Sequence, residues 1–388
     1  MDCRKYVLMA MLLLSMQKLK AQVETFQTAD STSGILYATQ NWKQLLVSGH
    51  QSVLNGIDFP DLRLRLGYAS FILKNYSAAL NEYEKVLEND SYNQTARYYI
   101  YLCYKYLNRD LLASQQLPYL DSIKAGQQNS QFGLISASLE SSYQFADQPN
   151  RENASYTRFG LSNYLFRKLQ LDQSVIYFKQ SLFTDQGFMR YKNNDRQTEY
   201  FAKLSYAVYN RFTLFGAYHY LHTNYQNQTY NSHVFTAGLQ FTGTYYALQG
   251  DVNLGNIFEE HLAQYNAKIS FYPLGNLNLY FILRESLHNQ NNQHQLIFNP
   301  TTGFKVIKNI WLETSATFGN LNNYIDNDGL YIYNAIDVSK LKLQETIYHQ
   351  LNNRMLLEFN YTYDKKQLDL QTVNYNQHSI TAGVLWKF

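Results

Sequence analysis

The distal two thirds of the chain alternate apolar and polar residues with a period of two. Between residues 355 and 364, Met355, Leu357 and Phe359 share one face, whereas Glu358 and Asn360 share the other. This period is typical of β-strands, whose successive side chains point to opposite faces of a sheet. From residue 131 onward it predicts about fourteen strands, with about 12 to 16 as the range because 330–336 offers one further short strand. The fourteen expected strands are 131–146, 153–166, 169–182, 196–209, 211–223, 230–243, 245–256, 260–272, 276–288, 293–306, 309–320, 338–349, 354–364 and 377–388.

The two faces of the expected strands differ in chemistry. One face is apolar and rich in Tyr and Phe near the strand ends, and the other carries most of the charges. Short turns alternate with longer polar loops, of which 183–195, 320–337 and 365–376 are the longest. Aromatic girdles and short periplasmic turns are typical of transmembrane β-barrels. Since unpaired strand edges cannot face lipid, the pattern predicts an antiparallel transmembrane barrel that closes on itself.

Two acidic residues interrupt the apolar face. Glu285 and Glu345 fall on it by simple alternation, and a charge at the bilayer midplane is destabilising. An interfacial position, a β-bulge and a different local register are the alternatives. We expect Glu285 to lie at the membrane interface.

The N-terminal part has a helical pattern with a repeat of 34 residues. This spacing separates Trp42 from Tyr76, and Leu45 from Ala79. The small and large packing residues fall where tetratricopeptide repeats place theirs, so the stretch resembles two to three such repeats. An ordinary α-helical hairpin domain is the alternative. The residues expected at the packing or partner face are Trp42, Leu66, Gly67, Tyr76, Ala79, Tyr83, Tyr104 and Ala113.

Both ends of the chain carry features of an exported barrel. Arg4 and Lys5 precede a short apolar run, and a small residue, Ala21, offers a cleavage site, as in a secretory signal peptide. A buried first helix of a globular domain is the alternative for this segment. The final strand alternates and ends at Trp386 and Phe388, which resembles the C-terminal signature of bacterial outer-membrane barrels. An amphipathic edge strand of a soluble protein is the alternative for this last segment.

Composition narrows the functional classes further. The chain has 36 Tyr and 23 Phe, but only 16% of its residues are charged, below the roughly 25% of soluble proteins. The chain has 33 Lys and Arg and 30 Asp and Glu, of which the expected signal peptide contains four basic residues and one acidic residue. The mature chain then has 29 of each, and its formal net charge is zero. This balance argues against nucleic-acid binding by bulk positive charge. Cys103 is the only remaining cysteine, which excludes an intrachain disulfide and a cysteine-ligated zinc site.

The polar face offers candidate functional charges but no catalytic constellation. The expected lumen charges either form a network of ion pairs that fills the barrel or line a polar conduit. The histidines are scattered, with no HExxH motif, no nucleophile motif and no glycine-rich phosphate loop. We therefore assign no catalytic, cofactor or metal residues and expect a non-enzymatic protein. The principal expected lumen charges are Glu199, Lys203, Asp251, Lys268, Arg284, Glu313 and Glu358.

The order of signal, helical repeat and barrel resembles outer-membrane proteins of the Bacteroidota that carry periplasmic repeats. Its layout is also similar to exopolysaccharide export proteins, although the repeat and the barrel are smaller here. The expected domains are a signal peptide at 1–21, a periplasmic helical domain at 22–128 and an outer-membrane barrel at 129–388. The resemblance implies contact with outer-membrane lipid and with a periplasmic or outer-membrane protein partner. We expect the repeats to dock this partner for export or envelope assembly; a passive diffusion channel for small solutes is the alternative.

Overall fold

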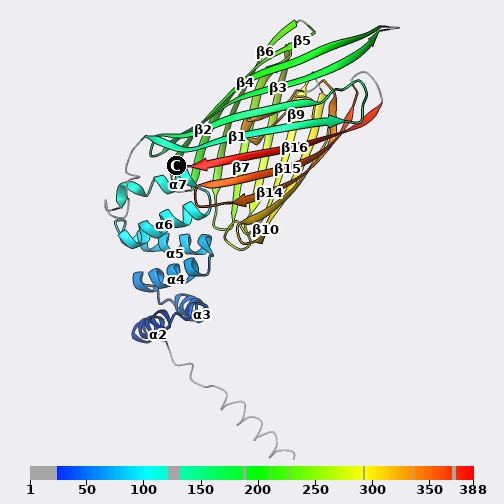
Figure 1. Ribbon diagram of the computed structural model, residues 1–388. Coiled ribbons are helices and arrows are strands. Elements are labelled where there is room, and N and C mark those ends of the chain that lie inside the picture. The colour runs from blue at the N-terminus through cyan, green and yellow to red at the C-terminus, as the bar shows by residue number, and fades with distance from the viewer. Residues whose placement is uncertain are drawn as a thin grey trace, which may run out of the picture.

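The computed structural model describes residues 24–120 and 132–388, apart from 187–188, 210, 227, 292, 335 and 369–372 (Figure 1). The expected signal peptide at 1–21 lies outside the described residues. Within the described part of the chain, no helix combines the length and apolar character needed to cross a membrane.

Six helices form the described N-terminal part. The amide oxygens of Asn75 and Asn93 accept hydrogen bonds from backbone amides in the first turns of two helices, as good N-caps do. The turns inside the three successive helix pairs pass through Gln40, Lys74 and Asn108, which lie 34 residues apart and all have positive φ. The 34-residue spacing is thus present in the backbone itself. The helices are α2 (Phe26–Ala38), α3 (Trp42–Leu54), α4 (Pro60–Ile72), α5 (Tyr76–Asn89), α6 (Gln94–Tyr106) and α7 (Asp110–Ser114), followed by the 3₁₀ turn η1 (Leu117–Tyr119).

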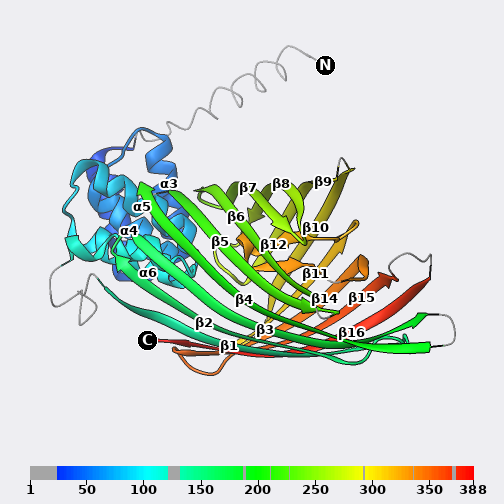
Figure 2. The same cartoon turned by 90° about the horizontal axis from the view of Figure 1, so that it is seen from above.

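Fourteen antiparallel strands close into a barrel in which β1 pairs with both β2 and β16 (Figures 1 and 2). Each wall strand pairs with the wall strands that precede and follow it in the sequence. β11 pairs directly with β14, because the two strands between them, β12 and β13, form a separate small sheet. The wall strands are β1 (Gly133–Ala146), β2 (Ala154–Phe166), β3 (Leu169–Gln186), β4 (Met189–Tyr209), β5 (Phe212–Tyr225), β6 (Gln228–Thr242), β7 (Tyr246–Ile257), β8 (Glu260–Phe271), β9 (Leu279–Gln290), β10 (Gln293–Ile307), β11 (Ile310–Phe318), β14 (Val338–Gln350), β15 (Met355–Gln367) and β16 (Asn374–Lys387). The predicted barrel and its fourteen strands are confirmed.

Two predicted loops differ from the structure. Residues 183–195 were expected to form a loop, but β3 and β4 continue their pairing as far as Gln186 and Met189. Polar composition misled the prediction there, because a hairpin that extends beyond the apolar band needs no apolar face. The segment 320–337 is not an external loop either: its strands β12 (Tyr324–Asp326) and β13 (Tyr331–Tyr333) pair with each other rather than with the barrel wall.

The outer surface of the barrel is apolar. Outward positions on β9, for example, are Phe281, Leu283 and Leu287, whose side chains are 39–46% exposed. A closed sheet leaves no unpaired edge, and such a large exposed apolar surface is stable only in a lipid environment. The barrel is therefore a transmembrane β-barrel. Glu285 and Glu345 do lie on outward positions, each between apolar outward neighbours on its strand rather than at a strand end.

The helical array sits against the barrel end that carries the short turns (Figures 1 and 2). The Ser77 amide donates to the Gly275 carbonyl at 3.0 Å, and Glu84 forms an ion pair with Arg211. The chain's last strand ends here as well, because Lys387 donates to Asn108 at 3.0 Å. Further contacts join the helices to several turns along this rim: Asn75–Tyr245, Lys74–Asn276, Asp110–Tyr164, Ser114–Arg167 and Gln115–Ala207.

Candidate functional site

The barrel lumen is occupied by the segment between β11 and β14, of which the structure describes residues 319–334 and 336–337; we call it the lumen segment. Its short hairpin is buried at Tyr324 and Ile325, and the 3₁₀ turn η3 (Asn327–Gly329) connects the two strands. Ile325 exchanges two hydrogen bonds with the side chain of Gln264 on β8: its amide donates at 3.0 Å and its carbonyl accepts at 2.6 Å. The segment is therefore bound to the wall through backbone groups as well as side chains.

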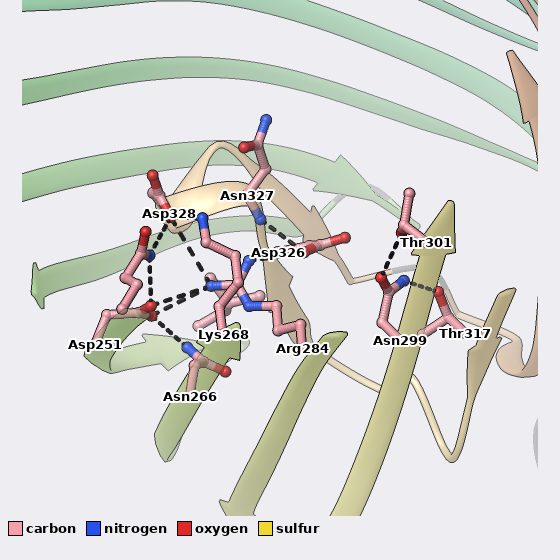
Figure 3. A network of polar contacts seen from close by, with 12 residues as sticks. Asp251, Asn266, Lys268, Arg284, Asn299, Thr301, Thr317, Asp326, Asn327 and Asp328 are labelled. Carbon is pink, nitrogen blue, oxygen red and sulfur yellow. Dashed lines mark hydrogen bonds and ion pairs between the residues drawn. The ribbon is translucent and has the colours of Figure 1, made fainter. Parts of the chain in front are cut away.

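Asp328 of the lumen segment contacts several charged and polar residues of the wall (Figure 3). It accepts hydrogen bonds from Lys203 Nζ at 2.8 Å and from Gln249 Nε2 at 2.7 Å. Lys268 Nζ and one guanidinium nitrogen of Arg284 lie 3.9 and 4.0 Å from Oδ1, the oxygen that also accepts from Gln249. Asp328 is 8% exposed and has a φ of 57°, a left-handed conformation that Asp tolerates better than most residues.

Arg284 connects Asp326 and Asp328, two of the three acidic residues of the segment, to the wall. Its guanidinium nitrogens lie 3.0 Å from Asp326 of the segment and 3.3 Å from Asp251 of β7. The cluster thus contains three cations and three carboxylates. Without the segment, the wall would keep the three cations Lys203, Lys268 and Arg284 against two carboxylates, Asp251 and Asp172, and unpaired buried charges are strongly unfavourable. The charges of the wall therefore match those of the segment.

Other parts of the segment are bound in the same way. The Gly329 carbonyl accepts from His219 at 2.8 Å, and the other ring nitrogen of His219 lies 2.8 Å from Glu199. Tyr331 donates to Glu140 at 3.1 Å, and Lys342 donates to Tyr333 at 2.5 Å. These contacts come from β1, β4, β5 and β14, so the segment is held from several sides of the barrel.

A polar cavity remains beside the lumen segment. It has a volume of about 660 Å³ and is lined by wall residues and by segment residues such as Tyr331 and Asp326. Glu313 lines it and accepts hydrogen bonds from Tyr280 at 2.5 Å and Tyr348 at 3.4 Å. Glu358 also lines this cavity. A smaller cavity of about 210 Å³ lies near Lys203.

The seven lumen charges singled out from the sequence thus take three kinds of position. Lys203, Asp251, Lys268 and Arg284 belong to the cluster around Asp328, Glu199 supports His219, and Glu313 and Glu358 line the larger cavity. Sequence reasoning missed Asp326 and Asp328, because they lie in a stretch without strand alternation. A local signal was available, since Asp326-Asn327-Asp328-Gly329 in a long loop is typical of a tight turn.

The helical positions singled out from the sequence are partly core and partly surface. Leu66, Ala79 and Tyr83 are fully buried, and Ala113 and Tyr104 nearly so. A Cβ atom on Gly67 would lie 2.8 Å from the ring of Tyr83, so only glycine allows this contact. Trp42 and Tyr76 remain half-buried. At the other end of the chain, Trp386 is paired with both Met355 and Ala137, and the Phe388 amide donates to the Ile135 carbonyl at 3.0 Å.

An aromatic surface extends across the helical array. Tyr37 contacts Trp42 and Tyr68, with ring centroids 5.5 Å apart in each pair. Tyr76 and Tyr106 stack at 4.7 Å, and Tyr106 is 53% exposed. We call this set the aromatic face; its members are Tyr37, Trp42, Tyr68, Phe71, Tyr76, Tyr99 and Tyr106.

No group of three or more His, Cys, Asp or Glu side chains suited to a metal ion occurs among the described residues. No protein-family model matches the sequence. No curated protein matches it either.

Several solved structures are similar to part of this chain. A bacterial polysaccharide outer membrane secretin is 8% identical, with 66% of this chain and 98% of that chain covered and a TM-score of 0.41. The Acinetobacter baumannii outer membrane protein Omp33 gives the same identity and TM-score, with 66% and 99% covered. The Pseudomonas putida toluene transporter TodX is 8% identical, with 66% and 90% covered and a TM-score of 0.43. Identities this low and TM-scores below 0.5 assign neither a family nor a function to the chain.

Proposed function

We propose that this chain is an outer-membrane protein of export or envelope assembly whose barrel is closed at rest. In this proposal the N-terminal helices are tetratricopeptide-like repeats that bind a protein partner in the periplasm. The observation that carries the proposal is the lumen segment, which occupies part of the barrel lumen and is held by the charge cluster around Asp328. A barrel blocked in this way does not serve as a permanently open pore, so its activity depends on something that acts on it.

The orientation follows from general properties of bacterial barrels. Their short turns face the periplasm, and their termini lie on that side. The helical array contacts the short turns and the last strand, which supports a periplasmic position for it.

The aromatic face supports partner binding. Protein interfaces are enriched in Tyr, Trp and Phe because these side chains bury a large area at a low cost in conformational entropy. Docking of the helices on the rim leaves Tyr37 and Tyr106 exposed, at 37% and 53%. The partner would then bind next to the barrel mouth.

A small-solute channel is the second candidate. The polar cavity of about 660 Å³ favours it, because a modest movement of the lumen segment would enlarge this space. In that case the helices serve as a structural cap on the rim.

Planar-bilayer recording separates the two candidates. The proposal expects the purified full-length protein to show no steady conductance, whereas a steady open conductance favours the channel.

Affinity purification from detergent extracts tests the partner. We expect a protein that co-purifies with the wild type and is lost in the variant Tyr37→Ser/Tyr106→Ser. The control is Tyr92→Ser, which removes a tyrosine that is 72% exposed and lies outside the aromatic face. Equal recovery with both variants would contradict docking at this face.

A further inference from the structure

The outer wall of the barrel carries a groove along β10 and β11. Its floor consists of small outward residues: Pro300 and Thr302 on β10, and Thr314 and Ala316 on β11. Its volume is about 880 Å³. Larger side chains flank the floor on both sides, namely Ile269, Phe271, Phe281 and Leu283 on β8 and β9, and Leu343, Tyr361 and Tyr363 on β14 and β15. The outer wall is therefore concave at β10 and β11.

The groove also contains a carboxylate. Glu345 lines it and accepts a hydrogen bond from Thr314 Oγ1 at 2.7 Å. Its outward neighbours along β14 are Leu343 and Ile347, which are 41% and 43% exposed. Glu345 therefore lies within the apolar band rather than at its edge.

A second carboxylate lies at the border of the groove. Glu285 is exposed on β9 and follows Leu283, which flanks the groove, by one outward position. Among the residues that the structure describes, Glu285 forms neither an ion pair nor a hydrogen bond, and its pairing partners across the strands are Ala267 and Phe298. An acidic group in this position is unfavourable against lipid tails.

The sheet is weakened at the same place. Proline has no amide hydrogen and breaks a strand ladder where it occurs. The pairing of β10 with β11 includes Phe298 with Phe318 and Thr301 with Ser315, but it omits Pro300 and its neighbour Asn299. The concave shape, the two carboxylates and the interrupted ladder thus coincide on one side of the barrel.

We propose that this groove binds a membrane-embedded segment of a partner protein that carries a basic or hydrogen-bond-donating side chain opposite Glu345. Acyl chains have no donor to offer a carboxylate, so lipid alone does not satisfy this surface. A second copy of the chain is also a poor fit. A two-fold interface centred on Glu345 would place the carboxylates of both copies against each other.

Site-specific photo-cross-linking in the outer membrane tests this proposal. A photoreactive residue replaces Thr302 or Ala316 in the full-length protein, and the matched controls are Leu239 and Leu248, outward residues on β6 and β7 that are 44% and 42% exposed. We expect one and the same cross-linked protein from both groove positions and none from the controls. In the variant Glu345→Leu the yield should fall about tenfold, as expected when binding loses a charged hydrogen bond.

Four results would overturn the proposal: adducts of lipid alone, adducts of a second copy, equal yields at groove and control positions, or an unchanged yield in Glu345→Leu. The heat-dependent shift in electrophoretic mobility shows whether each variant is folded, and Glu345→Leu removes a charge from the membrane face, so it should fold. The variant Tyr37→Ser/Tyr106→Ser should leave this cross-link unchanged, which separates the groove from the helical docking face.

Discussion

At the residue scale, the contact between Gly67 and Tyr83 determines how closely α4 and α5 pack. The Tyr83 ring is fully buried and fills the space that a side chain at position 67 would need. Tight cores accept an added methyl group only by displacing their neighbours.

We therefore expect Gly67→Ala to destabilise the helical array by about 1–3 kcal/mol, even though alanine favours helices by up to about 1 kcal/mol. Urea unfolding of the full-length protein in detergent, followed by circular dichroism at 222 nm, measures this change. The control is Gly34→Ala in α2, where the nearest atoms to an added Cβ lie 3.8 Å away. Equal stability of the two variants would contradict the packing argument.

Glu82 makes the stability of the helices depend on pH. Its carboxylate is 5% exposed, accepts from Arg63 at 2.7 Å and lies 3.1 Å from His50 Nε2. Burial raises the pKa of Glu82, but the hydrogen bonds from His50 and Arg63 together outweigh burial and leave this pKa below its usual value.

A lowered pKa in the folded state stabilises the fold above the unfolded-state pKa of about 4.3. This contribution is lost as the pH falls through the lower folded-state value. We expect the urea midpoint of the helical transition to drop between pH 6 and pH 3, and Glu82→Gln to show a lower midpoint at pH 6 with a weaker pH dependence. An unchanged pH profile in Glu82→Gln would assign the effect to other groups.

At the element scale, the lumen segment is held by its charges and by two small apolar clusters, one around Ile325 and one around Tyr324. The cluster is neutral only when Asp326 and Asp328 are in place beside the wall residues. Removing one partner of a buried ion pair costs about 3–5 kcal/mol. The position of the segment should therefore respond to a single charge change.

We expect Asp328→Asn to release the segment from the wall. Asn keeps the tolerance for positive φ, so the change removes the charge without straining the backbone. Planar-bilayer recordings should then show openings at least about tenfold more frequent than in the wild type. Asn322→Ala, in the same segment but outside the cluster, should behave as the wild type, and silent recordings from Asp328→Asn would show that the segment stays bound without this charge.

At the scale of the whole molecule, strands were easier to predict than the placement of loops. The period of two survives from β1 to β16 because each strand separates a lipid face from a lumen face. The segment 320–337 does not separate lipid from lumen, so it carries no period of two. Its local sequence does not indicate whether Asp328 contacts solvent or Lys203, which lies 125 residues away in the sequence. The expectation that Glu285 lies at an interface did not anticipate its place among apolar neighbours. The groove was also beyond prediction, since Pro300 and Ala316 become neighbours only in the folded sheet.

The attachment of the helices to the rim leads to a prediction about the ion pair between Glu84 and Arg211. These side chains are 21% and 30% exposed, so the pair should contribute about 0.5–1 kcal/mol. Arg211→Glu should speed hydrogen exchange of α5 amides, and Glu84→Arg combined with Arg211→Glu should restore slow exchange. If the double variant exchanges as fast as the single variant, the two side chains do not act as a pair.

The rim contacts also bear on the order in which the molecule assembles. The turns that hold the helices are scattered over more than 200 residues of sequence, from Arg167 to Lys387, and become one continuous platform only after β1 has met β16. The helices are synthesised before the barrel strands, yet they can dock on the rim only after the barrel has closed. Docking of the helices therefore requires that the barrel has closed in the bilayer. Any factor that recognises the docked helices would distinguish fully inserted barrels from incompletely inserted ones.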